Sequence, residues 1–92
     1  MSIKILFIGD IVGNPGREAI AKLLPKLKAE FRIELTVANA ENAAGGAGLT
    51  PQVADDLFRM GVDVLTTGDH IWDRREINAA LLNNPLLLRP AN

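Results

Sequence analysis

The stretch Ile3-Lys-Ile-Leu-Phe-Ile8, followed at once by Gly9-Asp-Ile-Val-Gly13, decides the fold of this 92-residue chain. Its first six residues are almost continuously apolar and rich in β-branched side chains, which is typical of a strand buried on both faces of a parallel sheet. A helix is expected next, because Asn14 can cap a helix and Pro15 suits its first position.

The apolar side chains of this expected helix repeat at helical spacing, at Ile20, Leu23, Leu24, Leu27 and Phe31. Pro25 lies within the same segment and has no backbone N–H, so a kink or a break is expected there. Two further apolar strands are predicted over residues 33–38 and 62–67. Between them, Thr50-Pro51 is expected to begin a second helix and Gly61 to end it.

A third helix is predicted to start near Asp73. Asp73 and Glu76 have the spacing of a capping box, and Trp72 and Ile77 occupy the two positions of a hydrophobic staple. Residues 86–89 are expected to begin a fourth strand. The order strand, helix, strand, helix, strand, helix predicts an α/β fold, a right-handed parallel sheet with flanking helices.

Composition narrows the class of protein. The length fits one small domain, and a net charge of -1 argues against a nucleic-acid footprint or a polybasic membrane surface. The absence of cysteine excludes disulfide scaffolds, thiol catalysis and thiolate zinc sites. Asp10 ends the first apolar run far short of a secretory signal, and no run approaches the roughly 18 apolar residues of a membrane span. We therefore expect a cytoplasmic protein without a membrane partner.

Polar residues follow all three expected strands, at the positions where open parallel sheets bind their ligands. These residues are Asp10, Asn39, Glu41, Asn42, Asp69 and His70. The three groups are separated by about 30 residues, the length of one strand-helix-strand unit. Three acidic residues are therefore expected to converge on one edge of the sheet.

Clustered carboxylates favour a bound cation, because like charges at short range destabilise one another unless a positive charge compensates them. Oxygen ligands with one imidazole suit manganese, iron or magnesium. The small residues 43–48 would also let a substrate approach the backbone.

Each of these residues has a plainer interpretation when taken alone. Asp10 can stabilise a turn, Glu41 can be a solvated loop charge, and His70 can hydrogen-bond its own loop. Their joint placement at three strand ends favours a site. Arg17, Arg74 and Arg75 are interpreted as solvated helix-surface residues and are left out of it.

Other phosphate-binding motifs do not fit. The glycine spacing of residues 9–16 matches neither the dinucleotide fingerprint nor the P-loop. Aspartyl-phosphate chemistry is disfavoured because no second Asp stands two residues after Asp10.

Four motifs together resemble the bacterial YmdB-type branch of the calcineurin-like metallophosphoesterases. They are Gly9-Asp-Ile-Val-Gly13, Ala40-Glu-Asn-Ala-Ala-Gly-Gly46, Gly68-Asp-His-Ile-Trp-Asp73 and Arg89-Pro-Ala-Asn92. The resemblance runs the length of the chain. It implies that residues 1–92 are the N-terminal part of a single metallophosphoesterase domain, a sandwich fold whose remainder lies beyond a truncation.

The activity that the resemblance implies is hydrolysis of cyclic nucleotides of the 2′,3′ type at a two-metal site containing iron or manganese. Asp10 would bind the first metal, Glu41 would bridge both, and Asp69 would bind the second. His70 would polarise the phosphate or protonate the leaving oxygen, and Asn42 would contact the substrate. The nucleophile would be a hydroxide formed from water at a metal ion.

Two features depart from the wider pattern. The family usually has Asn where this chain has Asp69, and the later histidines that complete both metal shells are not among these residues, which hold one histidine in total. Val12 stands where the superfamily has its early histidine, which the YmdB-type branch lacks too. Two alternatives therefore stay open, a non-catalytic metal- or nucleotide-binding module and an inactive fragment, as does assembly into a homo-oligomer.

Overall fold

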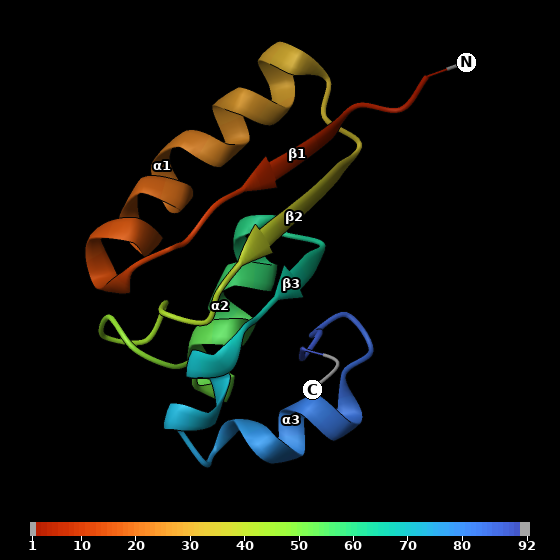
Figure 1. Ribbon diagram of the computed structural model, residues 1–92. Helices are drawn as coiled ribbons and strands as arrows, with labels where there is room; N and C mark the ends of the chain where they lie inside the picture. Colours follow the sequence, from red (N-terminus) through yellow and green to blue (C-terminus); the bar gives the residue numbers. More distant parts are fainter. Residues whose placement is uncertain (1, 91–92) are drawn as a thin grey trace.

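The computed structural model describes residues 2–90 as a parallel three-stranded sheet with helices between and after its strands (Figure 1). In chain order the elements are β1 (Ile5–Ile8), α1 (Gly13–Phe31), β2 (Leu35–Asn39), α2 (Pro51–Met60), β3 (Val64–Thr66), the 3-10 helix η1 (Asp69–Asp73) and α3 (Ile77–Asn83). This order confirms the predicted α/β fold. Within the described residues, no helix is both long and apolar enough to cross a membrane.

The sheet has the order β1-β2-β3, and both pairs of neighbouring strands are parallel. In the register, Ile8 pairs with Ala38, and Ala38 pairs with Leu65. Because all three strands run in one direction, the loops that follow them gather at the same end of the sheet (Figure 1). This arrangement brings the polar residues after each strand to one edge.

One face of the sheet carries the core. Ala38 and Leu65 are fully buried on this face, and Leu6 and Ile8 of β1 pack against the same cluster. The two long helices contact one another and contribute buried leucines, Leu24 from α1 and Leu57 from α2. Alternation along the strands turns the intervening side chains to the opposite face.

The expectation that the first strand is buried on both faces is wrong. Ile5 and Phe7 are 57% and 65% exposed, and they alternate with the partly buried Leu6 and Ile8. The physical reason is that the core packs on one face of β1 only, so the side chains that alternate to the other face are exposed. All three strands are also shorter than predicted, and each of them begins two residues later than its apolar run.

Helix α1 differs from its prediction at Asn14, Pro15 and Pro25, and Pro15 is its third residue where the first was expected. It begins at Gly13 with Val12 as the N-cap, and Asn14 lies inside the helix, where its amide donates to Glu18 instead of capping. Pro25 is accommodated within a helix that continues to Phe31, so the expected break is absent. Pro25 is exposed, whereas the neighbouring Leu24 is buried, and this packing holds the helix across the missing backbone bond.

Helix α2 follows its prediction at both ends. The Thr50 hydroxyl accepts a hydrogen bond from the backbone N–H of Val53, with Pro51 as the first helical residue. Gly61 ends the helix with φ 112°, a left-handed conformation that favours glycine.

The predicted start of the third helix is wrong. Asp73 ends η1, and Glu76 is the residue before α3 with no side-chain capping bond. Ile77 is the first residue of α3 and not its fourth, and Trp72 lies within η1, so the two do not occupy the positions of the expected staple. The predicted fourth strand is reduced to a single bridge, in which Leu87 pairs with Leu65 in parallel. The 3-10 helix η1 occupies the residues at which the third helix is expected to start, and α3 begins only at Ile77.

Candidate metal centre

Backbone hydrogen bonds continue past the ends of the strands and hold the following loops side by side. The N–H of Ile11 donates to the carbonyl of Asn39 at 3.2 Å, and the N–H of Ala40 donates to that of Thr66 at 2.9 Å. Asp10 precedes the first of these residues and Glu41 follows Ala40 directly. The residues predicted at the three strand ends are therefore carried by adjoining backbone.

Glu41, Asp69 and His70 form one compact group. Each offers a carboxylate oxygen or a ring nitrogen, and these atoms lie within 4.8 Å of one another. Oε2 of Glu41 accepts a hydrogen bond of 3.2 Å from the backbone N–H of His70 and lies 3.8 Å from Nδ1 of the same residue. The Glu41 side chain is only 18% exposed, against 49% for His70, so the carboxylate is the more buried of these two groups.

Asn42 connects the first strand end to this group. Its side-chain Nδ2 donates to Oδ1 of Asp10 at 3.0 Å, and its Oδ1 lies 2.5 Å from Nδ1 of His70. Asp10 is not part of the compact group of Glu41, Asp69 and His70, and Asn42 is the side chain that joins it to them. The predicted substrate-binding residue thus contacts two other predicted site residues.

Asn39, one of the polar residues expected at the strand ends, and Gly68, which is not among the predicted site residues, place the Glu41 carboxylate. The amide Nδ2 of Asn39, the last residue of β2, donates to Oε1 at 3.3 Å. Gly68 lies on the other side, where a Cβ atom would be 2.5 Å from Oε1 and 2.7 Å from Oε2. Gly68 belongs to one of the four sequence motifs, but the pattern carries no sign that its missing side chain makes room for Glu41.

The donor set fits a divalent cation. Carboxylate oxygens with one imidazole nitrogen are typical ligands of manganese and iron. Among the described residues, neither Glu41 nor Asp69 forms an ion pair with Lys or Arg, and the only ring that approaches the Glu41 carboxylate is that of His70. A cation held between them would offset their negative charge.

The arginines that the sequence places outside the site divide into two kinds. Arg75 is exposed, as expected for a solvated residue, whereas Arg74 and Arg17 are half-buried. Arg17 donates to the carbonyl of Gly13 within α1, and Arg74 donates to the loop that follows Asn42. The solvated interpretation is therefore wrong for Arg74, because helical periodicity does not reveal contacts with a distant loop.

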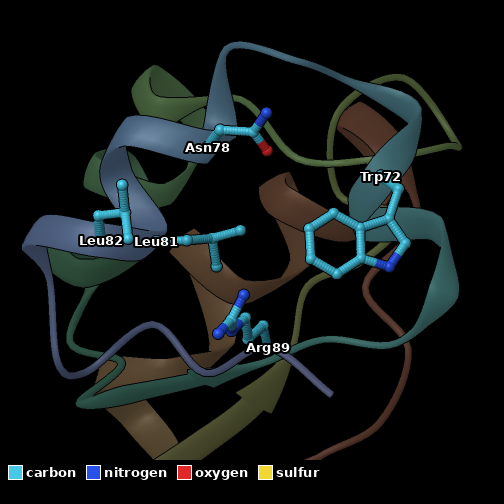
Figure 2. Close-up of a pocket in the computed structure, with 5 residues that line it drawn as sticks. All are labelled: Trp72, Asn78, Leu81, Leu82 and Arg89. Carbon is cyan, nitrogen blue, oxygen red and sulfur yellow. The ribbon is translucent and has the colours of Figure 1, made fainter. Parts of the chain in front are cut away.

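A separate hollow of about 410 Å³ lies beside α3 (Figure 2). It is lined by Trp72, Asn78, Leu81, Leu82 and Arg89, and includes none of the predicted site residues. The Trp72 indole lies along one side of this hollow, with Leu81 across from it. Trp72 thus lines a hollow that is distinct from the candidate metal centre.

Comparison with known proteins gives consistent matches over almost the whole chain. The chain is 46% identical over 90 residues to a 2′,3′-cyclic-nucleotide 2′-phosphodiesterase of Bacillus subtilis, a match that covers 98% of this chain and 34% of that protein. A crystal structure described as a novel phosphatase from Mycoplasma pneumoniae superposes with a TM-score of 0.94 at 37% identity, covering 100% of this chain and 33% of that one.

A second crystal structure, of a hypothetical protein from Thermus thermophilus, matches with a TM-score of 0.84 and 41% identity over 94% of this chain and 33% of that one. The chain thus spans about a third of the length of the proteins it matches. A sequence model of the family described as YmdB-like protein matches residues 6–92. Since that match includes nearly every residue, the chain belongs to the YmdB-like protein family.

Proposed function

We propose that this chain forms part of a metal-dependent phosphodiesterase that hydrolyses 2′,3′-cyclic nucleotides in the cytoplasm with two iron or manganese ions. The observation that carries the proposal is the group of Glu41, Asp69 and His70 at the ends of two neighbouring strands. The 46% identity to a cyclic-nucleotide phosphodiesterase supports the choice of substrate. Because the chain spans about a third of that relative, the activity is proposed for the site to which these residues contribute.

The roles proposed for the metal ligands are those that the family resemblance implies. Asp10 would hold one ion, Asp69 would hold the other, and Glu41 would bridge the two. The support for Glu41 is its position. Its side chain is more buried than that of His70, it accepts a hydrogen bond from Asn39, and its carboxylate packs against Gly68. When bound, such ions offset the charge of a phosphate and make water more acidic.

His70 is proposed as the proton donor to the leaving oxygen. Its ring is half-exposed and therefore accessible to a ligand, while Nδ1 contacts Asn42. If Nδ1 donates to the Asn42 oxygen, Nε2 is the ring nitrogen that remains available to a substrate. Asn42 is proposed to help orient the phosphate, and its contacts with Asp10 and His70 would place it between metal and substrate.

One observation favours a second candidate, a non-catalytic module that binds metal or nucleotide. Asp69 carries a negative charge at a position where the resemblance implies Asn. Such a module would bind its ligand tightly without turning it over.

The test is hydrolysis of 2′,3′-cyclic AMP by protein that has been stripped with a chelator and reloaded with Mn²⁺ or Fe²⁺. The proposal expects activity only in the reloaded protein, and its loss in Asp10→Ala and Glu41→Ala. Glu30→Ala is the matched control, because Glu30 is exposed near the last residue of α1, at the opposite end of that helix from Asp10. Full activity in both site variants contradicts the proposal, and tight nucleotide binding without turnover favours the second candidate.

A further inference from the structure

The loop over residues 43–48 follows Glu41 and Asn42 and consists only of alanine and glycine. Gly45, Gly46 and Gly48 have φ values of 67°, 94° and 75°, in the left-handed region where glycine is favoured. Such a segment has no bulky side chain of its own and loses much conformational entropy when it is fixed. One hydrogen bond lies within the loop, from the Ala44 N–H to the Gly48 carbonyl, and contacts with other parts of the chain add to its order.

Arg74 supplies such contacts from outside the loop. Its Nη2 donates to the carbonyl of Ala44 at 3.1 Å, and its Nε donates to the carbonyl of Ala47 at 3.4 Å. The two acceptors lie three residues apart, so one guanidinium spans the loop. Hydrogen bonds from a charged donor are stronger than those between neutral groups.

The stem of Arg74 also packs directly on the loop backbone. A Cβ atom on Gly48 would lie 2.5 Å from Cγ of Arg74, and one on Gly45 would lie 3.4 Å from its Nη2. At position 48, only glycine leaves room for the side chain of Arg74. Arg74 is half-buried by this packing, whereas the next residue, Arg75, is exposed.

The two segments that Arg74 joins are those that carry the candidate ligands. Arg74 immediately follows η1, which contains Asp69 and His70, and the loop immediately follows Asn42. Between these segments the structure also has the bond from the His70 N–H to Glu41 and the contact between His70 and Asn42. Arg74 adds two hydrogen bonds to residues further along the chain, at the carbonyls of Ala44 and Ala47.

We propose that Arg74 is a positioning residue, which holds the loop after β2 against η1 and so keeps the candidate ligands within reach of one ion. Arg74 itself contacts neither the metal nor the substrate in this proposal. The inference rests on the metal site of the proposed function, because it assigns Arg74 a role in the geometry of that site. Outer residues that orient metal ligands commonly affect metal affinity although they do not touch the ion.

The test measures Mn²⁺ binding by calorimetry and amide hydrogen exchange of residues 43–48 in the metal-free protein. We expect Arg74→Ala to weaken Mn²⁺ binding about tenfold and to speed exchange in the loop. Arg75→Ala is the matched control, with no change expected in either measurement. Thermal unfolding is recorded for every variant, so that a loss of affinity is compared between folded proteins.

Arg74→Lys keeps the proposal falsifiable if Arg74→Ala does not fold. A lysine retains the charge and the aliphatic stem but cannot span both carbonyls with one fixed fork, so we expect an intermediate loss of affinity. Wild-type affinity in a folded Arg74→Ala or Arg74→Lys variant overturns the role of Arg74 and leaves the metal site intact. Failure of the wild-type protein to bind Mn²⁺ would instead overturn the proposed function.

Discussion

A methyl group on Gly68 would lie 2.5 Å from Oε1 of Glu41, well inside the distance at which two such atoms make favourable contact. Gly68 follows the end of β3 and Glu41 follows the end of β2, so the missing side chain on one loop makes room for the carboxylate on the other. The position of the candidate bridging ligand is thus set by a residue that carries no functional group.

Gly68→Ala is therefore expected to displace the Glu41 carboxylate and to weaken Mn²⁺ binding by about tenfold, as displaced ligand geometry commonly does. Stability should change little, because φ at Gly68 is −134°, which alanine adopts freely, and the clash is with the end of a flexible side chain. Calorimetric titration and thermal unfolding measure the two effects separately.

The matched control is Gly9→Ala, since a Cβ atom at Gly9 meets nothing within 4 Å. It should leave both metal affinity and stability unchanged. Unchanged Mn²⁺ affinity in Gly68→Ala would show that the carboxylate of Glu41 is not a ligand, or that it tolerates the displacement.

Lys28→Met is expected to lower the free energy of unfolding by about 1 kcal/mol. The Lys28 ammonium on α1 donates to the carbonyl of Gly61 at 2.5 Å, and Gly61 is the C-cap residue of α2. Positive charge near the last carbonyls of a helix also interacts favourably with the helix dipole. Urea denaturation compares this variant with Lys26→Met, in which an exposed lysine of the same helix is replaced and no change is expected.

The convergence of Glu41, Asp69 and His70 could be predicted from the sequence because it depends on one general property. Parallel strands end at the same edge of a sheet, so residues just after them lie together wherever the helices between them are of ordinary length. The roles of Thr50 and Gly61 are predictable for a similar reason, since helix capping depends on the residues next to the helix end.

Features that depend on contacts across the fold could not be predicted in this way. The exposure of Phe7 depends on what covers the second face of the sheet, and the apolar run alone does not record it. The clearance at Gly68 and the attachment of Arg74 to the loop each join residues 27 or more positions apart. Neither contact produces a periodic pattern, and arginine on a predicted helix surface has the same appearance whether it is solvated or bound.

Pro25→Ala is expected to raise the free energy of unfolding by about 1–2 kcal/mol, because proline within a helix lacks an N–H donor and crowds the carbonyl four residues earlier. This cost exceeds the entropy that proline saves in the unfolded chain. Pro25 is exposed, so the substitution removes little packing. Pro51→Ala is the contrasting variant, because Pro51 opens α2, where no donor is needed, and no gain is expected. Equal stability of Pro25→Ala and the wild-type protein in urea would show that α1 is already distorted at this residue.

Asp69→Asn is expected to weaken binding of Mn²⁺ by tenfold or more, about 1.4 kcal/mol per factor of ten. The substitution keeps an oxygen donor of the same size but removes one negative charge from a group whose ligand atoms lie within 4.8 Å of one another. At that range a full charge interacts strongly with a divalent ion even at the polar surface of a protein. Asp73→Asn, four residues later at the end of η1, removes the same charge outside the group and should leave the affinity unchanged. Because screening by salt acts mainly on the distant charge, the two variants should differ at low and at physiological ionic strength alike. Equal losses in both variants would mean that Asp69 acts through the overall charge of the loop and does not bind the ion.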